Sequence, residues 1–412
     1  MTGGGPAAPA GGVGPGARVF ERSAPRVALV GASGHGLWHR RQLAPLHEAG
    51  RLRVVGLCDL RPIEGAPDAP VPAGAGLFTD HRELLRQARP DVVIICTPPH
   101  THLPIARDAL RAGADVLLEK PPVLSLVEHR ALAAVLAETG RACQVGFQAL
   151  GSAALAELTE AIVAGAIGTV TGIAAVASWQ RDDAYYARAP WAGRRSVDGR
   201  PVLDGSLANP LAHALMQSLA VAAAALGRPA FPHDIELERY RTRDIEVDDT
   251  ACLRTALDGG IRMVVAVTLC GEDFIPGEII VHGSAGRAVL EYPTDRLLLP
   301  GDDGLREVPG RASLLENLLA HRVDPGVPLI APLGRTAPFT ALLEVVGAAP
   351  EPLDIDPAYV TAIGSGPQRV NSIGGVNEAL RDAGERLALF SELGVPWALP
   401  PYGKRTANNG EN

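Results

Sequence analysis

Short apolar runs rich in β-branched residues alternate with helix-like stretches over the first 148 residues. Five such runs lie at residues 26–31, 53–59, 91–97, 115–118 and 143–147. Helices are predicted between them, from the turn after the first run to about Gly50 and over residues 80–88, 102–112 and 125–138. Continuous apolar strands separated by helices predict a doubly wound parallel sheet, because both faces of each strand must be covered.

The pattern changes after Gln148. A helix is predicted over residues 153–164, a long strand over 169–179 and an Ala/Leu-rich helix over 209–226. Closely spaced strand runs then follow, at residues 236–243, 250–257, 262–270, 278–283, 288–292 and 296–299. Such spacing is typical of a largely antiparallel sheet. The chain from Ser313 is helical again, with an extended Pro-rich stretch at 348–357.

These patterns predict an α/β plus α+β protein with four parts. Residues 1–24 form a flexible lead, since Gly, Ala and Pro bury too little surface to offset ordering. Residues 25–148 form a Rossmann-type dinucleotide-binding domain. Residues 149–345 form a substrate and oligomerisation domain with a large, open, mostly antiparallel sheet. Residues 346–412 form a C-terminal extension that packs on the other domains.

Composition excludes several functional classes. The formal net charge is −8 and aromatic residues make up 4%, so neither phosphate neutralisation nor base stacking indicates a nucleic-acid partner. No apolar run reaches about 18 residues, and the first residues lack the features of a secretory signal. The five cysteines show no C-x-x-C spacing, which indicates buried thiols in a reducing compartment rather than disulfides or zinc. We expect a cytoplasmic protein with no metal and no membrane partner.

A glycine-rich turn follows the first predicted strand. It reads GASGHG and contains Gly31, Ser33, Gly34, His35 and Gly36. A strict G-x-G-x-x-G motif would have glycine at Ser33, but the strand before the turn and the helix after it are what a dinucleotide site requires.

An acidic residue ends the second predicted strand. This residue, Asp59, lies 23 residues after Gly36, where its carboxylate can accept hydrogen bonds from ribose hydroxyls. An aspartate there favours NAD over NADP, since it would repel a 2′-phosphate, although Arg61 nearby weakens that preference.

Two further turns are more specific than the glycine turn. Residues 97–102 read TPPHTH and residues 119–122 read EKPP, with the run LRAGADVLL between them. This pair of turns closely resembles the Gfo/Idh/MocA family of NAD(P)-dependent oxidoreductases, which act on sugars, inositols and similar polyols. The resemblance covers residues 26–148 well and continues more loosely through AGAIGTV at 164–170 and the antiparallel sheet.

The resemblance implies roles for the residues in these turns. The expected cofactor contacts beyond the glycine turn are Thr97, Pro98, His102, Glu119, Lys120 and Gln148. In the family the Lys–Pro bond of the EKP turn is cis, and the lysine spans the nicotinamide ribose and the substrate hydroxyl. Lys120 also has a physical signal of its own, because only it and Lys404 are lysines among 38 basic residues. An ammonium there can donate a hydrogen bond to an oxygen that gains negative charge.

The second catalytic element departs from the family. The usual pattern is an Asp followed four residues later by a His at the start of a helix. In VLDGSLANPLAHA, Asp204 matches the Asp, but Ala208 occupies the His position. Asn209 follows, and His213 lies four residues beyond it on the same predicted helical face. Three alternatives stay open: His213 relays the proton, Asn209 only positions substrate, or the standard chemistry is absent. If His213 only packs, Asp204 becomes the candidate base.

The loop at 181–200 combines aromatic and arginine side chains. Aromatic faces with charged forks suit carbohydrate rings and hydroxyls, or a subunit contact. The residues concerned are Tyr185, Tyr186, Arg188, Trp191, Arg194 and Arg195. Since family members commonly pair through the open face of the second sheet, a homo-oligomer, dimer or tetramer, is expected.

The most specific hypothesis is a hydride transfer between NAD or NADP, with NAD favoured, and a secondary alcohol or ketone of a sugar, inositol or related polyol. Lys120 would stabilise the alkoxide, and His213 with Asp204 and Asn209 would relay the proton. Two alternatives remain: an NAD-dependent glycosidase without net redox change, and a dinucleotide-binding sensor without acid–base chemistry.

Overall fold

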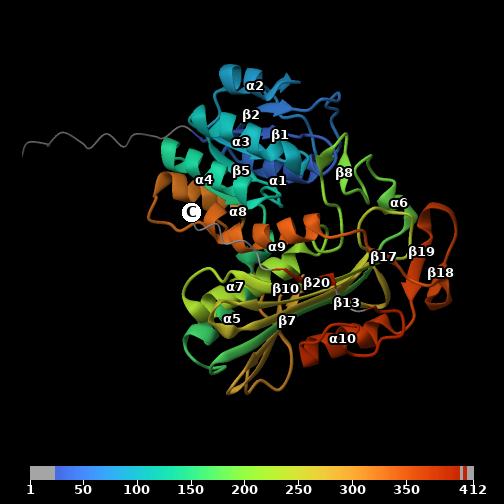
Figure 1. Ribbon diagram of the computed structural model, residues 1–412. Helices are drawn as coiled ribbons and strands as arrows, with labels where there is room; N and C mark the ends of the chain where they lie inside the picture. The colour runs from blue at the N-terminus through green and yellow to red at the C-terminus, as the bar shows by residue number, and fades with distance from the viewer. Residues whose placement is uncertain (1–23, 400–401, 406–412) are drawn as a thin grey trace, which may run out of the picture.

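The structure is a computed structural model that describes residues 24–399 and 402–405. The predicted flexible lead lies outside the described residues except for Ala24. Figure 1 shows two sheets, the first in blue and cyan above a larger one in green, yellow and orange. The five cysteines are free, and all but Cys96 are buried.

The first sheet has six parallel strands in the order β3-β2-β1-β4-β5-β6, so the prediction of a doubly wound parallel sheet is confirmed. β3 was not predicted, because its three residues carry too little periodicity to separate them from the Pro-rich loop before them. The strands are β1 (Arg26–Val30), β2 (Arg53–Cys58), β3 (Gly76–Phe78), β4 (Val92–Ile95), β5 (Asp115–Leu118) and β6 (Cys143–Val145). The helices are α1 (Gly36–Glu48), α2 (His81–Ala88), α3 (His102–Arg111) and α4 (Leu126–Thr139).

Two of these helices begin where their capping residues place them. The Asp80 side chain accepts hydrogen bonds from the backbone N–H groups of Arg82 and Glu83. Ser125 accepts one from Glu128. Each cap satisfies donors that the first helical turn leaves without a partner.

The second sheet has ten strands and is mostly antiparallel. Its order is β16-β15-β14-β13-β7-β12-β11-β10-β17, with β20 paired to β10. Only the β7–β12 and β10–β17 pairs are parallel among its described strands. The strands are β7 (Val170–Gln180), β10 (Pro232–Arg241), β11 (Thr250–Leu257), β12 (Arg262–Thr268), β13 (Cys270–Gly283), β14 (Gly286–Tyr292), β15 (Arg296–Leu298), β16 (Arg306–Glu307), β17 (Leu353–Asp354) and β20 (Tyr402–Arg405).

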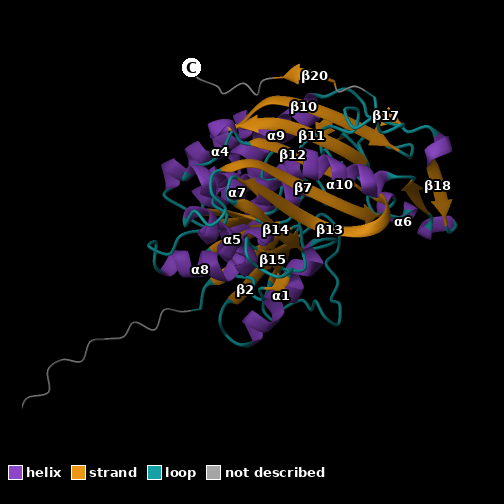
Figure 2. Ribbon diagram, turned by 90° about the horizontal axis from the view of Figure 1, so that it is seen from below, coloured by secondary structure: helices purple, strands orange, loops and turns teal. Residues whose placement is uncertain are grey.

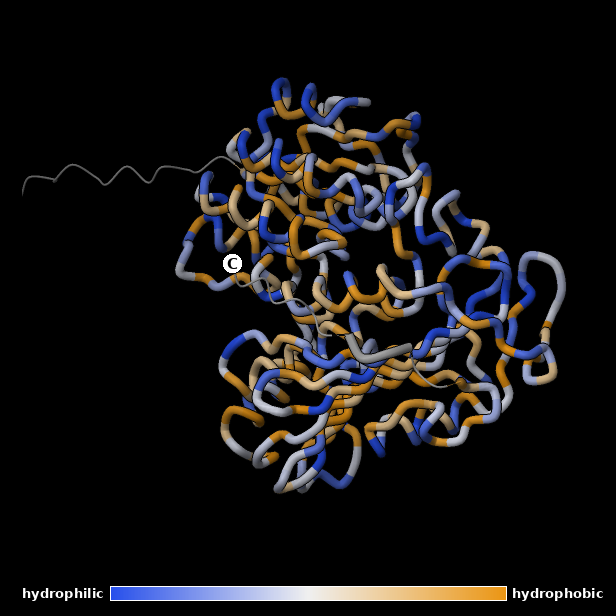
Figure 3. Tube along the Cα trace, in the orientation of Figure 1, coloured by the Kyte–Doolittle hydropathy of each residue, from blue (hydrophilic) through white to orange (hydrophobic). Residues whose placement is uncertain are grey.

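The helices and small hairpins of this half complete the fold. The helices are α5 (Ala153–Val163), α6 (Asp183–Tyr186), α7 (Ala212–Leu226), α8 (Leu314–Val323), α9 (Ala337–Ala348) and α10 (Val376–Arg386). The hairpins pair β8 (Ser196–Val197) with β9 (Arg200–Pro201), and β18 (Val360–Ile363) with β19 (Val370–Ile373). Figure 3 shows that the apolar stretches gather in the two sheets and the helices against them.

Both faces of the second sheet are covered by this chain. On one face, Ala175 and Ala177 of β7 belong to a core shared with α5, α7 and the first sheet. On the other, Ala174 and Val176 pack with α10 and the segment after it, ending at Trp397. Figures 1 and 2 place α10 against the central strands. The sheet face that was expected to be open for subunit pairing is therefore covered by α10 and the segment after it. The homo-oligomer stays a prediction, and an open sheet face no longer supports it.

Candidate active site

The glycine-rich turn connects β1 to α1 at the carboxyl edge of the first sheet. Gly31 and Gly34 have φ of +88° and +59°, and a Cβ on Gly31 would lie 2.2 Å from the carbonyl oxygen of Cys96. Packing against Cys96 thus requires glycine at Gly31, and the positive φ favours glycine at both positions, which is what a tight turn beneath a pyrophosphate needs. Helix α1 begins at Gly36 with no acidic residue in its first turn, which suits an anion.

Asp59 holds this turn in place. One carboxylate oxygen accepts a hydrogen bond from the Ser33 backbone N–H at 2.8 Å, and the other accepts from Arg61 N–H at 3.0 Å. Ser33, at the position of the second glycine, is thereby fixed through its backbone. The Asp59 side chain is 10% exposed, beside the exposed side chain of Arg61. The sequence placed Asp59 at the turn but did not reveal this anchoring role.

His102 joins the two turns that carry the family resemblance. Its Nδ1 lies 3.0 Å from the carbonyl oxygen of Pro121, and its Nε2 lies 2.8 Å from that of Thr97. The Thr97 hydroxyl in turn accepts a hydrogen bond from Thr101 at 2.6 Å. Burial lowers the pKa of His102, which is 1% exposed. The ring is enclosed behind the turns and supports both of them, and the cofactor contact expected of His102 stays a prediction. Gln148 is half-buried at the end of the same sheet.

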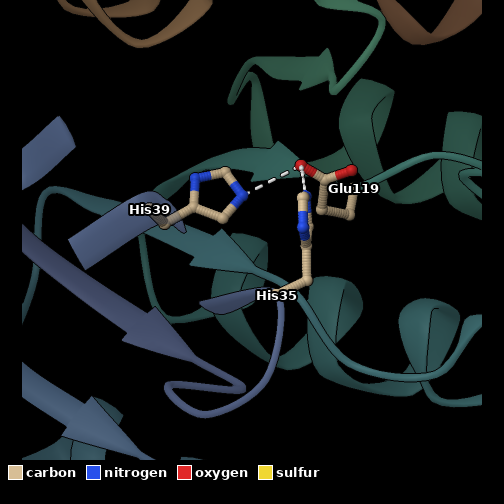
Figure 4. A group of neighbouring side chains, drawn as sticks. All are labelled: His35, His39 and Glu119. Atoms are coloured by element: carbon tan, nitrogen blue, oxygen red, sulfur yellow. Dashed lines mark hydrogen bonds and ion pairs between the residues drawn. The ribbon is translucent and has the colours of Figure 1, made fainter. Parts of the chain in front are cut away.

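Glu119 lies where β5 ends and faces two histidines of the glycine turn and α1 (Figure 4). His39 Nε2 is 2.9 Å from Glu119 Oε1, and His35 Nε2 is 3.9 Å from the same atom. Burial raises the pKa of Glu119, but the His39 hydrogen bond and the neighbouring positive charges outweigh it and lower that pKa to about 2. Glu119 is therefore a carboxylate at working pH.

Within the part of the chain that the structure describes, His35, His39 and Glu119 form the one group whose donor atoms could hold a metal ion. His35 is largely exposed, while Glu119 Oε1 is already engaged by His39. The expectation of no metal stays a prediction.

Lys120 reaches from the first sheet to the turn before α7. Its Nζ donates a hydrogen bond to Asn209 Oδ1 at 2.6 Å. The Lys120–Pro121 bond is cis, as the resemblance implied. Burial lowers the pKa of Lys120, against the opposing effect of Glu119 and Asp204. Lys120 is thus a partly desolvated cation with one neutral amide as its direct partner.

Asn209 separates Lys120 from Asp204. Its Nδ2 donates to Asp204 Oδ1 at 3.0 Å. Both Asp204 oxygens also accept from Arg188 Nη2, at 2.8 and 2.7 Å, and Oδ2 accepts from Gly193 N–H. The Asp204 side chain is 2% exposed. Asp204, the residue that matched the family motif, is therefore fully hydrogen-bonded, and it is Asn209 that stands beside Lys120.

His213 lies in the first turn of α7, inside an aromatic cluster. Its ring centroid is 5.8 Å from that of Phe147 and 5.5 Å from that of Tyr292. Burial, with the Lys120 charge adding to it, lowers the pKa of His213 to about 3. This burial weighs against His213 as the proton relay, and that role stays a prediction. The helix begins at Ala212, so Asn209 lies in the preceding turn rather than on a shared helical face.

Comparisons with known proteins agree with this geometry. Residues 25–147 match the model of an oxidoreductase family with an NAD-binding Rossmann fold, and residues 155–289 match the Gfo/Idh/MocA C-terminal domain. The chain belongs to the Gfo/Idh/MocA family. Its N-terminal segment is thus an NAD-binding Rossmann domain, and the predicted family and nicotinamide cofactor are confirmed.

Several similar proteins carry dehydrogenase names, and two carry the name of glycosyl hydrolase family 109. The chain is 34% identical over 146 residues to scyllo-inositol 2-dehydrogenase (NAD(+)) of Bacillus subtilis, and 32% identical over 143 residues to inositol 2-dehydrogenase of Rubrobacter xylanophilus. These matches cover 35% and 34% of this chain but only 41% and 40% of those relatives.

A solved structure shares the fold over most of the chain. The WlbA dehydrogenase of Bordetella pertussis, in complex with NADH and UDP-GlcNAcA, has a TM-score of 0.64 at 21% identity and covers 81% of this chain and 100% of its own. In the described residues, no helix is both long and apolar enough to cross a membrane.

Proposed function

We propose that this protein transfers a hydride between a nicotinamide dinucleotide and a secondary alcohol or ketone of a sugar, inositol or related polyol. The observation that carries the proposal is Lys120 Nζ, held 2.6 Å from Asn209 Oδ1 at the carboxyl edge of an NAD-binding domain. Two relatives with inositol 2-dehydrogenase names support the substrate class.

The glycine turn and Asp59 fit the dinucleotide. The turn offers backbone close to the α1 N-terminus, and the Asp59 carboxylate can accept hydrogen bonds from ribose hydroxyls. Thr97 and Glu119 border the same edge of the sheet. When bound, the nicotinamide ring supplies the hydride acceptor for oxidation or the donor for reduction.

In this proposal Lys120 exchanges the proton of the substrate hydroxyl. Oxidation removes a hydride from the carbinol carbon and a proton from its oxygen. In the neutral amine form Nζ accepts that proton, and in the reverse reaction the ammonium returns it. The lowered pKa of Lys120 supports this role, because it increases the amine fraction at working pH.

Asn209 orients Lys120 without titrating. Because Arg188 and Gly193 occupy the Asp204 carboxylate, Asp204 acts by fixing the Asn209 amide rather than as a base. A carboxylate beside Lys120 would favour the ammonium, whereas the Asn209 amide leaves the amine accessible. His213 stays neutral and contributes packing against Phe147 and Tyr292.

The test combines binding with turnover. Calorimetry should detect NAD or NADH binding, and a panel of sugars and inositols should give a NADH absorbance change with NAD or NADP. Lys120→Ala should lower kcat by about 10²–10³, the equivalent of about 3–4 kcal/mol, with unchanged thermal unfolding.

Arg41→Ala on α1 is the matched control. It breaks an exposed ion pair with Asp68 and should keep full turnover. No dinucleotide binding at millimolar concentration would refute the proposal. Glycoside cleavage without a net NADH signal would favour the glycosidase alternative.

A further inference from the structure

Flat side chains form one continuous stack beside Asn209. Guanidinium groups alternate in it with aromatic rings: Arg181 Cζ lies 4.9 Å from the Trp179 ring centroid and 5.1 Å from that of Tyr185. Arg188 Cζ lies 3.7 Å from the Tyr185 centroid and 4.6 Å from that of Trp191. We call six side chains the arginine–aromatic stack: Phe274, Trp179, Arg181, Tyr185, Arg188 and Trp191.

The stack lies on the face of the second sheet that borders the candidate site. Side chains alternate along β7, and Ala177 packs into the core shared with α7 while Ser178 donates to Asn377 of α10. Trp179 therefore returns to the site face. Within the stack, between the two arginines, Tyr185 Oη is 3.5 Å from Asn209 Nδ2.

The outer end of the stack is open to solvent. Phe274 is 66% exposed and stacks with Trp179, with centroids 6.3 Å apart. The indole Nε1 of Trp179 is buried and has no hydrogen-bond acceptor among the described residues. The outer end of the stack thus presents aromatic surface to a ligand in solution.

The two arginines of the stack differ in whether a carboxylate pairs with them. Arg188 is neutralised by both oxygens of Asp204. Arg181 donates to the backbone carbonyl of Gln180 at 2.9 Å, but no carboxylate of the described chain lies within ion-pair distance of it. The nearest acidic residues in sequence are engaged elsewhere: Asp182 accepts from Tyr185 N–H, and Asp183 pairs with Arg243.

We propose that Arg181 is a specificity-determining residue that binds an acidic group of the substrate, a carboxylate or a phosphate. The inference rests on the proposed function and deepens it: the substrate is an acidic sugar derivative rather than a neutral polyol. The centroids of the Trp179 and Tyr185 rings lie 4.9 and 5.1 Å from Arg181 Cζ, and the N–H groups that are not used by the Gln180 carbonyl can bind an oxyanion in a fork. Tyr185 connects Arg181 to the proposed reaction site, because its hydroxyl lies 3.5 Å from Asn209, the hydrogen-bond partner of Lys120.

Calorimetry on the full chain shows whether a carboxylate or a phosphate is the group that binds. The probes are a hexose, the matching hexuronate and the matching hexose 6-phosphate. We expect at least one acidic probe to bind about 10- to 100-fold tighter than the hexose, because a charge-assisted pair of hydrogen bonds adds binding free energy of that order. Whichever acidic probe binds tighter identifies the group. Equal affinity for all three, or no binding of either acidic probe at tens of millimolar, would overturn the proposal.

Variants test whether Arg181 is responsible for the preference for an acidic probe over the hexose. Arg181→Gln should remove the preference for the acidic probe and leave hexose affinity unchanged. Arg181→Lys should restore part of it, because lysine keeps the charge and loses the fork. Arg194→Gln, in the same loop but paired with Glu246, is the control and should keep the wild-type preference. An equal loss for hexose and acidic probe in Arg181→Gln would show a structural role instead.

Failure of this inference is distinguishable from failure of the proposed function. Binding of the acidic probe requires no hydride transfer. Dinucleotide-dependent turnover of a neutral polyol, without preference for its acid, would refute only the role of Arg181. An Arg181-dependent preference in a protein that binds no dinucleotide would refute only the proposed function.

Discussion

Glu238 on β10 should make the stability of the protein depend on pH. It is 3% exposed, and its Oε1 accepts a hydrogen bond from Ser391 Oγ at 2.5 Å in the segment that follows α10. Burial raises the pKa of Glu238 from 4.5 to about 7, although the Ser391 hydrogen bonds oppose the shift. The folded state therefore binds more protons than the unfolded chain between these two values.

The direction of this pH dependence follows from the linkage between proton binding and folding. With a raised folded pKa, the free energy of unfolding falls as pH rises through the interval from about 4.5 to about 7 and is level above it. At about 1.4 kcal/mol per pH unit, this interval corresponds to a loss of about 3 kcal/mol. Glu238→Gln keeps the acceptor for Ser391 but carries no charge. It should be nearly neutral at about pH 4.5 and stabilise the protein by about 3 kcal/mol at about pH 8.

Urea unfolding of wild type and variant at both pH values measures the difference. Glu236→Gln on the same strand is the control. It removes an ion pair with Arg254, so it should give no gain at the higher pH. A Glu238→Gln effect of equal size at both pH values would refute the reasoning, because the benefit would then not come from a buried charge.

Three further results are expected. Asp59→Ala should weaken binding of both NAD and NADP, because the Ser33 backbone loses its hydrogen-bond acceptor, and it should weaken NAD more. Calorimetry with both dinucleotides measures the two losses, and equal losses would contradict a contact between Asp59 and the ribose. His213→Phe should keep the shape of the kcat profile at pH 5.5–7.5, because a histidine with pKa about 3 is neutral there; loss of an acidic limb would contradict this. Arg188→Met should destabilise the protein by about 3–5 kcal/mol in urea unfolding, because it leaves the Asp204 carboxylate buried without its cation; a change under about 1 kcal/mol would contradict that role.

The sequence by itself determined the alternation of strands and helices. Apolar runs such as 91–97 appear buried on both sides because a parallel sheet covers both faces, and that signal is local. The EKPP and TPPHTH turns were readable for the same reason: each is a short segment at a strand end. The parallel sheet, the family and the nicotinamide cofactor followed from them.

Only the tertiary structure decided which polar residues meet. Lys120 and Asn209 are 89 residues apart, and His39 is 80 residues from Glu119, so no spacing could pair them. Likewise, the pKa of His213 depends on the rings packed around it rather than on its neighbours in sequence. Hydrogen bonding and desolvation act over a few ångströms in space, and only folding sets those distances.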